Sequence, residues 1–344
     1  MASSPVFYGV LCFAVGQRRD ASADLGANDV AYPQLHLNLW EHGSETFLDV
    51  GLLVPRACTY ERLRFYFPWR LPDVPAEDLL RKINDASSVA SIFNESWTVM
   101  KKGNSDHAVV SDSSSNRPLF ELASLTDCMV SESDSEHAHC VELDLARLFE
   151  RATAPCPAAY VRFRVFEVPT AFYSVGQDQG DAGLVSSWTK TDDLDFRLNV
   201  RRGAPPDMER RVGAFAEFSK VHLFLMRDRR YELAFQDAAF KACRSLEDEA
   251  FWANYSATVK EPPASALKHI KSCFGYQWSK RAVSREEPVN EFRILARFRR
   301  TELSKWRFIC YVIVLGALGN GAWEYGTAAL AKLWAQLLVQ FAGK

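Results

Sequence analysis

A short cluster of histidine and cysteine residues carries the side chains that a metal site needs. His137, His139 and Cys140 lie close together, and Cys128 precedes them. Zinc takes nitrogen and sulfur ligands in tetrahedral geometry, and a His-x-His pair places both imidazoles on one side of a strand. The same residues can instead form a solvated acidic loop that enters a strand at 140–145. The sequence alone favours this second interpretation.

Arginines recur on or beside the predicted strands. Arg162, Arg164, Arg197 and Arg229 lie in or next to segments in which apolar and polar residues alternate. Convergent guanidinium groups can bind phosphate or carboxylate in bidentate geometry. The functional interpretation is a pocket for an anionic small molecule. The simpler one, a basic solvent-exposed strand face, is the commoner arrangement.

Signatures of common catalytic sites are absent from the sequence, which contains no GxSxG, GxGxxG or GxxxxGK[ST] motif. Asp193 and Asp195 are two residues apart and can present paired carboxylates on one strand face. His222 and Cys273 are isolated candidates for a base and a nucleophile. All four also fit structural roles, so the residues do not favour an enzyme and they predict no cofactor.

The C-terminal segment 306–344 predicts attachment to a membrane. Its residues 308–323 form a run of 16 residues without a formal charge. With the flanking residues the run approaches the ~20 residues that a helix needs to cross a bilayer, and tryptophans favour both interfaces. Basic residues upstream place the preceding chain in the cytoplasm. The residues expected within this span include Trp306, Phe308, Val312, Leu315, Gly316, Gly319 and Trp323.

A second helix is predicted after the span, and it is amphipathic. Lys332, Gln336 and Gln340 recur every four residues and form a polar stripe, with Glu324 at its start. Such a helix can lie in the interface, fold back as a hairpin, or line a pore. Small residues in the span would permit close helix–helix contact, which suggests a homo-oligomer. A simple anchor is the alternative.

The preceding chain predicts an α+β fold with mainly antiparallel strands and a few helices. Alternating apolar residues indicate a hairpin over 35–54 and a second over 221–235, and 3.6-residue spacing indicates helices at 75–94, 237–256 and 263–273. The segment 290–305 fits a strand or a helix, and we favour a basic helix that leads into the bilayer. The blocks expected along the chain are 1–145, 146–285, 286–305 and 306–344.

Composition limits the classes of partner. The chain has 344 residues and a net charge of −2 at pH 7. Broad nucleic-acid binding requires a surplus of positive charge, so it is not expected. Eight scattered cysteines without a CxxC pair indicate a reducing compartment rather than a disulfide framework.

These features together predict a membrane-anchored cytoplasmic sensor and effector. Its body would recognise an anionic small molecule or a protein, while its C-terminal helices would associate with lipid and with each other to perturb the inner membrane. Bacterial stress or anti-phage defence would suit this layout. One alternative is a tail-anchored scaffold that recruits a soluble partner. Another is a membrane-tethered hydrolase that uses the His/Cys cluster or the Asp193/Asp195 pair.

Overall fold

The structure, a computed structural model, divides into two compact units. The first unit, here called the body, comprises residues 1–178 and 191–299, and the second comprises 179–190 and 300–344. The residues that the structure describes are 9–17, 32–42, 45–101, 107–130, 139–150, 156–177, 189–200, 214–238, 240–246, 248–258, 262–301, 309–310, 312–317, 326–327, 332 and 334.

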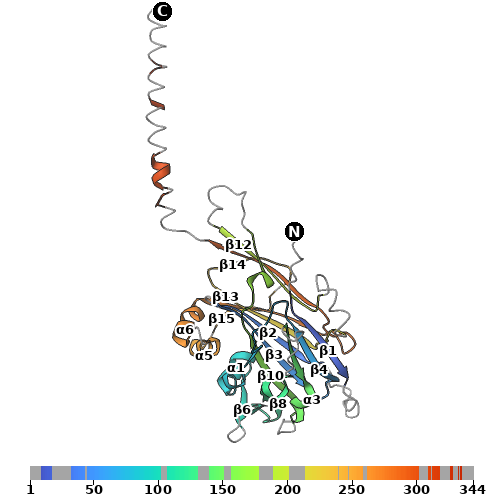
Figure 1. Ribbon diagram of the computed structural model, residues 1–344. Helices are drawn as coiled ribbons and strands as arrows, with labels where there is room; N and C mark the ends of the chain where they lie inside the picture. The colour runs from blue at the N-terminus through green and yellow to red at the C-terminus, as the bar shows by residue number, and fades with distance from the viewer. Residues whose placement is uncertain are drawn as a thin grey trace, which may run out of the picture. The chain divides into compact units, whose positions relative to one another are not determined.

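The body is an α+β fold with mostly antiparallel strands and a few helices (Figure 1). Its largest sheet has the strand order β15-β16-β13-β2-β3-β10-β8-β7-β6, and β5 also pairs with β10. Two neighbouring pairs are parallel, β13 with β2 and β10 with β8. The strands are β15 (Ala242–Ser245), β16 (Cys273–Arg281), β13 (Lys220–Asp228), β2 (Gln34–His42), β3 (Glu45–Pro55), β10 (Ala158–Val165), β8 (Pro118–Ala123), β7 (Ala108–Asp112), β6 (Trp97–Lys101) and β5 (Glu77–Asp78).

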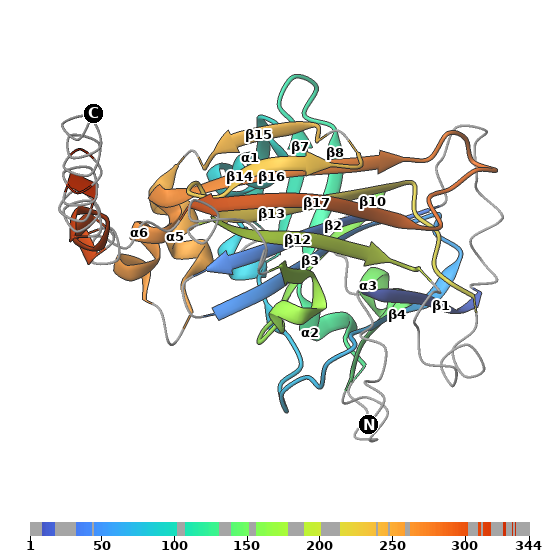
Figure 2. The same ribbon diagram turned by 90° about the horizontal axis from the view of Figure 1, so that it is seen from above.

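Two smaller sheets cover one face of the large sheet (Figure 2). One has the order β1-β4-β9 and the other β11-β12-β17-β14. Their strands are β1 (Leu11–Gln17), β4 (Tyr60–Tyr66), β9 (Cys140–Asp144), β11 (Ser174–Gln177), β12 (Thr189–Leu198), β17 (Phe292–Thr301) and β14 (Glu232–Gln236).

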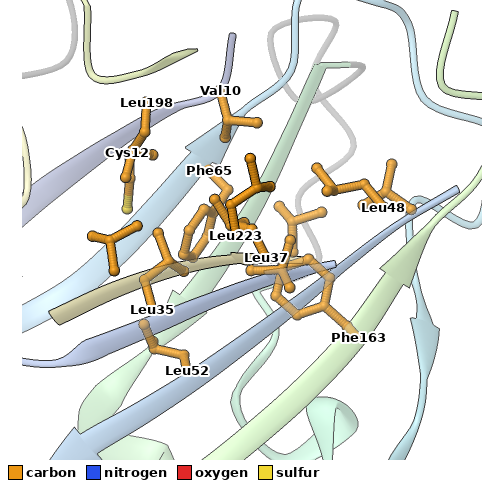
Figure 3. Packing of buried hydrophobic residues seen from close by; sticks show 14 of the residues in the cluster. Val10, Cys12, Leu35, Leu37, Leu48, Leu52, Phe65, Phe163, Leu198 and Leu223 are labelled. Carbon is orange, nitrogen blue, oxygen red and sulfur yellow. The ribbon is translucent and has the colours of Figure 1, made fainter. Parts of the chain in front are cut away.

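The main hydrophobic core lies between these layers. Figure 3 shows Leu35, Leu37 and Leu223 of the large sheet together with Phe65 and Leu198 of the two smaller sheets. All five side chains are fully buried. Alternate residues of a strand point to one face of a sheet, so the period-two apolar pattern supplies this core directly.

The hairpin predicted over 35–54 is confirmed as β2 and β3. Leu35 pairs with Leu52 and Leu37 pairs with Val50, so the apolar residues of both strands face the same side. A register shift of one residue would turn this set toward the opposite face, and burial therefore fixes the pairing.

Two local predictions are wrong for the same reason. Residues 292–301 form strand β17 rather than a basic helix. Phe292, Ile294 and Phe298 are buried, as expected for the alternating pattern of a strand. Strands β13 and β14 do not form a hairpin, because β13 pairs with β2 and β16 while β14 pairs with β17. In each case long-range pairing overrides the local pattern.

Helices were predicted too long at two positions. The region 75–94 contains β5, a 3-10 turn at Leu80–Lys82 and α1 (Ala86–Phe93), and the region 237–256 contains β15 and α5 (Glu249–Ser256). The helix predicted at 263–273 is confirmed as α6 (Pro263–Ser272). Two short helices, α2 (Leu125–Cys128) and α3 (Leu145–Glu150), lie between strands.

Strands from both predicted blocks, 1–145 and 146–285, are interleaved in the large sheet. Strand β10 lies between β3 and β8, and β13 lies between β2 and β16. The boundary predicted near residue 145 therefore does not separate one sheet from another. It is the pairing of β2 with β13, and of β3 with β10, that joins the two halves of the sequence into one body.

Helices α1, α5 and α6 contribute to a second hydrophobic cluster, together with large-sheet residues outside the main core. Trp40 of β2, Phe47 of β3 and Tyr160 of β10 are buried in it. Helix α1 begins at an N-cap, where the Asp85 side chain accepts a hydrogen bond from the Ser88 backbone N–H at 3.0 Å. It ends at Asn94, which adopts the left-handed conformation with φ 57°.

The second unit contributes helical residues at 309–310 and 312–317. Its described apolar side chains are solvent-exposed, with Ile313 at 63% and Trp334 at 65% exposure. Among the described residues, no helix combines the length and the apolarity needed to cross a membrane.

Candidate small-molecule groove

A groove lies on the side of the large sheet that carries the second hydrophobic cluster. Residues of β2, β3, β13 and β16 contribute to its lining, with further residues from α1, β6, β8 and β15. We call it the histidine groove, because His36 and His222 both line it. Its volume of about 580 Å³ falls within the roughly 300–1,000 Å³ typical of small-molecule sites.

Aromatic side chains form one wall of the histidine groove. Phe93 at the end of α1 lies 5.2 Å from Trp97 of β6 and 5.2 Å from Phe120 of β8, measured between ring centroids. Trp97 and Phe120 meet edge to face at 5.4 Å. Tilted and edge-to-face rings at such distances attract one another and leave an apolar surface on which a planar group can rest.

The two histidines lie side by side on neighbouring parallel strands. His222 of β13 is in register with His36 of β2, and their ring centroids are 5.0 Å apart in an edge-to-face arrangement. Burial lowers the pKa of His222 to about 3, and the charges of Lys220, Lys241 and Arg281 act in the same direction. Burial, His222 and Arg162 likewise hold the pKa of His36 well below its ordinary value. Both imidazoles are therefore neutral at physiological pH.

A hydrogen bond assigns the tautomer of His222, and His36 contacts a hydroxyl group. The Tyr160 hydroxyl accepts from Arg162 Nη1 at 2.9 Å, so its own proton can be donated to His36 Nδ1 at 3.5 Å. The Gln277 amide nitrogen donates to His222 Nδ1 at 3.3 Å. A neutral imidazole has one donor and one acceptor, so His222, which accepts at Nδ1, carries its proton on Nε2. Each neutral ring of the pair keeps one N–H donor.

A fully buried ionic network lies on the same face of the large sheet as the groove. Asp49 of β3 accepts hydrogen bonds from Arg164 Nε at 2.7 Å, from the Tyr255 hydroxyl at 2.7 Å and from Trp40 Nε1 at 3.0 Å. Arg162 donates to the Tyr255 hydroxyl at 2.6 Å. Burial would raise the pKa of Asp49, but Arg164, Arg162 and Tyr255 together hold it below its ordinary value. The network joins α5 to the sheet.

Gly51 leaves room for this arrangement. A Cβ atom at residue 51 would overlap the Tyr160 hydroxyl and would lie 3.0 Å from Arg162 Nη1. Tyr160 is itself fully buried, so it cannot swing away into solvent. Glycine at position 51 therefore leaves the space in which the Tyr160 hydroxyl lies beside His36.

The stability of the body is expected to fall as the pH decreases from about 6.5 to about 3. The upper limit is the ordinary pKa of histidine, and the lower limit is the pKa of His222 in the folded chain. In this window the unfolded chain binds protons that the folded chain excludes, which costs up to about 1.4 kcal/mol per pH unit for each histidine. Urea unfolding followed between about pH 7 and about pH 4 measures this slope. His222→Gln should make it shallower, and an unchanged slope would contradict the assignment of a neutral His222.

The predicted metal cluster is only partly within the described residues, because His137 lies outside them. Cys128 is buried, and the Cys128 thiol donates to the Leu125 carbonyl at 3.6 Å. His139 stacks on Tyr66, and Cys140 begins β9. Within the described parts of the chain, no group of three or more His, Cys, Asp or Glu side chains could hold a metal ion. The four-ligand zinc site remains a prediction.

The predicted anion-binding arginines occupy three separate settings. Arg162 and Arg164 are brought together, but both are fully buried in the network of Asp49. Arg197 donates to Asp195 on its own strand at 2.9 Å, and exposed Arg229 donates to the Lys271 carbonyl. Each guanidinium thus already contacts oxygen or hydroxyl groups of the chain.

The remaining candidates have structural contacts or lie beyond the described residues. Asp193 pairs with Arg297 at 2.6 Å, so each member of the Asp193/Asp195 pair faces an arginine. Burial raises the pKa of Cys273 to about 12, which keeps the thiol protonated. In the C-terminal segment Val312, Leu315, Gly316 and Lys332 are helical and exposed. Trp306, Phe308, Gly319, Trp323, Glu324, Gln336 and Gln340 lie outside the described residues.

Sequence reasoning named His222 but missed the groove to which it belongs. The signal that could have revealed it is a histidine at the second position of two short apolar strands, His36 in 35–39 and His222 in 221–225. A buried polar residue needs a partner or a purpose. Only the parallel pairing of β2 with β13, which the sequence does not disclose, places the two side by side.

Comparison with known proteins assigns no family. No family model and no curated protein matches the chain. Among solved structures, it is similar to the Fcho1 Mu homology domain of Danio rerio with bound Eps15 peptide, at 8% sequence identity. That match covers 88% of this chain and 82% of the other with a TM-score of 0.16, a likeness too low to assign fold or function.

Proposed function

We propose that the chain is a membrane-attached sensor whose body binds a small molecule in the histidine groove. The observation that carries this proposal is the groove itself, which combines an aromatic wall with polar groups that face one space. Sites for small molecules are typically concave and largely apolar, with few orienting polar side chains. We place the body on the cytoplasmic side, as the basic residues before the C-terminal segment suggest.

The groove offers two kinds of contact to a ligand. Phe93, Trp97 and Phe120 present ring surface. His36 of β2 and Gln277 of β16 present hydrogen-bonding groups. The buried network of Asp49, Arg162 and Arg164 on the same sheet face orders strands β3 and β10 before any ligand arrives. Such preorganisation reduces the loss of conformational freedom on binding and so favours affinity.

Attachment to the membrane is proposed for segment 306–344. Its support is the uncharged run 308–323 and the exposure of Ile309, Val312 and Leu315 on the described helical residues. An exposed apolar helical surface is unfavourable in water and favourable against lipid or another apolar helix. We further propose that these segments associate between copies and perturb the bilayer when the body binds its ligand.

Binding of a neutral aromatic probe tests the groove. The purified full chain is expected to bind 2-naphthylmethanol in isothermal titration, and Leu53→Trp should weaken the affinity at least about tenfold by filling the groove. Val283→Trp is the matched control, because Val283 is 84% exposed and does not line the groove. Equal affinities in wild type and Leu53→Trp, or no binding at all, would contradict the proposed function.

A further inference from the structure

Positive charge gathers at one end of the histidine groove. Lys220 at the start of β13 and Lys241 just before β15 both line it. Arg281 at the end of β16 lies directly opposite Lys220 in the antiparallel pairing. The backbone N–H of Lys241 donates to the Gln277 carbonyl at 2.6 Å, which holds Lys241 beside the same strand. Like charges placed opposite each other on a sheet repel, so this arrangement lowers the stability of the body by itself.

The electrostatic effect of these cations reaches the groove floor. Lys220 has its pKa lowered by partial burial and then by Arg281 and Lys241, while Glu95 acts in the opposite direction. The same three cations lower the pKa of His222. Among the described residues that line the groove, Glu95 is the acidic residue that these cations meet, and a site in which ammonium and guanidinium groups repel one another is stabilised when an anion enters.

The histidine pair adds donors at this end. His222 lies two residues from Lys220 on the same strand, so both side chains point to the same face of the sheet. Both imidazoles are neutral, so each carries one N–H donor, which lies on Nε2 in His222. Neutral N–H donors combined with ammonium groups match a phosphate or carboxylate, which offers only acceptors at neutral pH.

We propose that this end of the histidine groove binds the anionic group of a ligand whose planar ring rests on the aromatic wall of Phe93, Trp97 and Phe120. This inference rests on the proposed function, and it assigns the chemical class of the ligand: a phosphate or carboxylate attached to an aromatic or heteroaromatic ring. Ring contact and charge contact lie on different elements, so each can be tested while the other is kept.

Three probes that share one ring separate the two contacts. Isothermal titration of the full chain with 2-naphthyl phosphate, 2-naphthoate and neutral 2-naphthylmethanol compares a phosphate, a carboxylate and an uncharged group. At least one anionic probe is expected to bind about 10- to 100-fold more tightly than the neutral probe, the range expected for charge-assisted hydrogen bonds. The better of the two anions identifies the group that the natural ligand carries.

The double variant Lys220→Gln with Lys241→Gln should remove this preference and leave the affinity for 2-naphthylmethanol within about twofold of the wild type. The matched control is Arg70→Gln with Lys268→Gln, which removes the same formal charge from exposed positions outside the groove lining. Equal binding of all three probes would overturn the anion site while leaving the groove as a ring-binding site. An equal loss in the control would overturn it as well, because it would reduce the effect to net charge.

Discussion

Replacing Asp49 by asparagine is expected to destabilise the body by about 3–5 kcal/mol, because it leaves two fully buried arginines without their counter-charge. The side chains of Asp49, Arg162 and Arg164 are all inaccessible to solvent. Asparagine keeps the size of the residue but removes the charge, so the effect reports electrostatics rather than a cavity. The midpoint of urea unfolding measures the loss.

The matched control for this variant is Asp193→Asn. Asp193 also pairs with an arginine, at 2.6 Å, but Arg297 is 44% exposed. Exposed ion pairs contribute roughly 0–1 kcal/mol, so the control should change the midpoint little. Similar losses of stability in the two variants would show that Asp49 contributes no more than an exposed ion pair, which would contradict its role as the centre of a buried network.

Removing residues 306–344 is expected to release the protein from membranes completely. The uncharged run 308–323 is the part of the chain that membrane attachment is proposed to depend on. Each buried methylene contributes about 0.8 kcal/mol, so a run of this length dominates the partition between lipid and water. Flotation of vesicles with the full chain and with the chain ending at Lys305 measures the difference.

A second variant separates attachment from membrane perturbation. Replacing Lys332, Gln336 and Gln340 by leucine removes the polar stripe and keeps the apolar surface. Flotation should be unchanged, whereas dye leakage from cells that express the variant should cease. Leakage that persists would refute a pore lined by this stripe, and an unrelated anchor that restores full function would favour the scaffold hypothesis.

The strands of the central sheet were predictable because a strand that buries one face has apolar residues at every second position. Leu35, Leu37, Val50 and Leu52 specify both the hairpin and its register. The strand at 292–301 shows the limit of the same signal. Phe292 and Ile294 alternate correctly, but the adjacent apolar run favoured a continuous helix, and the pairing of β17 with β12 and β14 decides for a strand.

The candidate site was far less predictable, because its parts are distant in sequence. His36, Phe93, Phe120, His222 and Gln277 meet only after the two halves of the chain join in one sheet. Arg162 and Arg164 illustrate the opposite error. Arginines that alternate with apolar residues suggested a solvated or ligand-binding face, yet Asp49 and Tyr255 supply partners that allow full burial.

The most direct test of the account is to locate a bound ligand on the chain. A naphthyl phosphate that carries a photoreactive diazirine can be irradiated with the full chain, and the labelled peptides can be identified by mass spectrometry. We expect labels on the segments that contain Phe93, Trp97 and His222, and their loss in Leu53→Trp. Labels elsewhere in the body, or labels that Leu53→Trp leaves unchanged, would contradict the assignment of the histidine groove as the binding site.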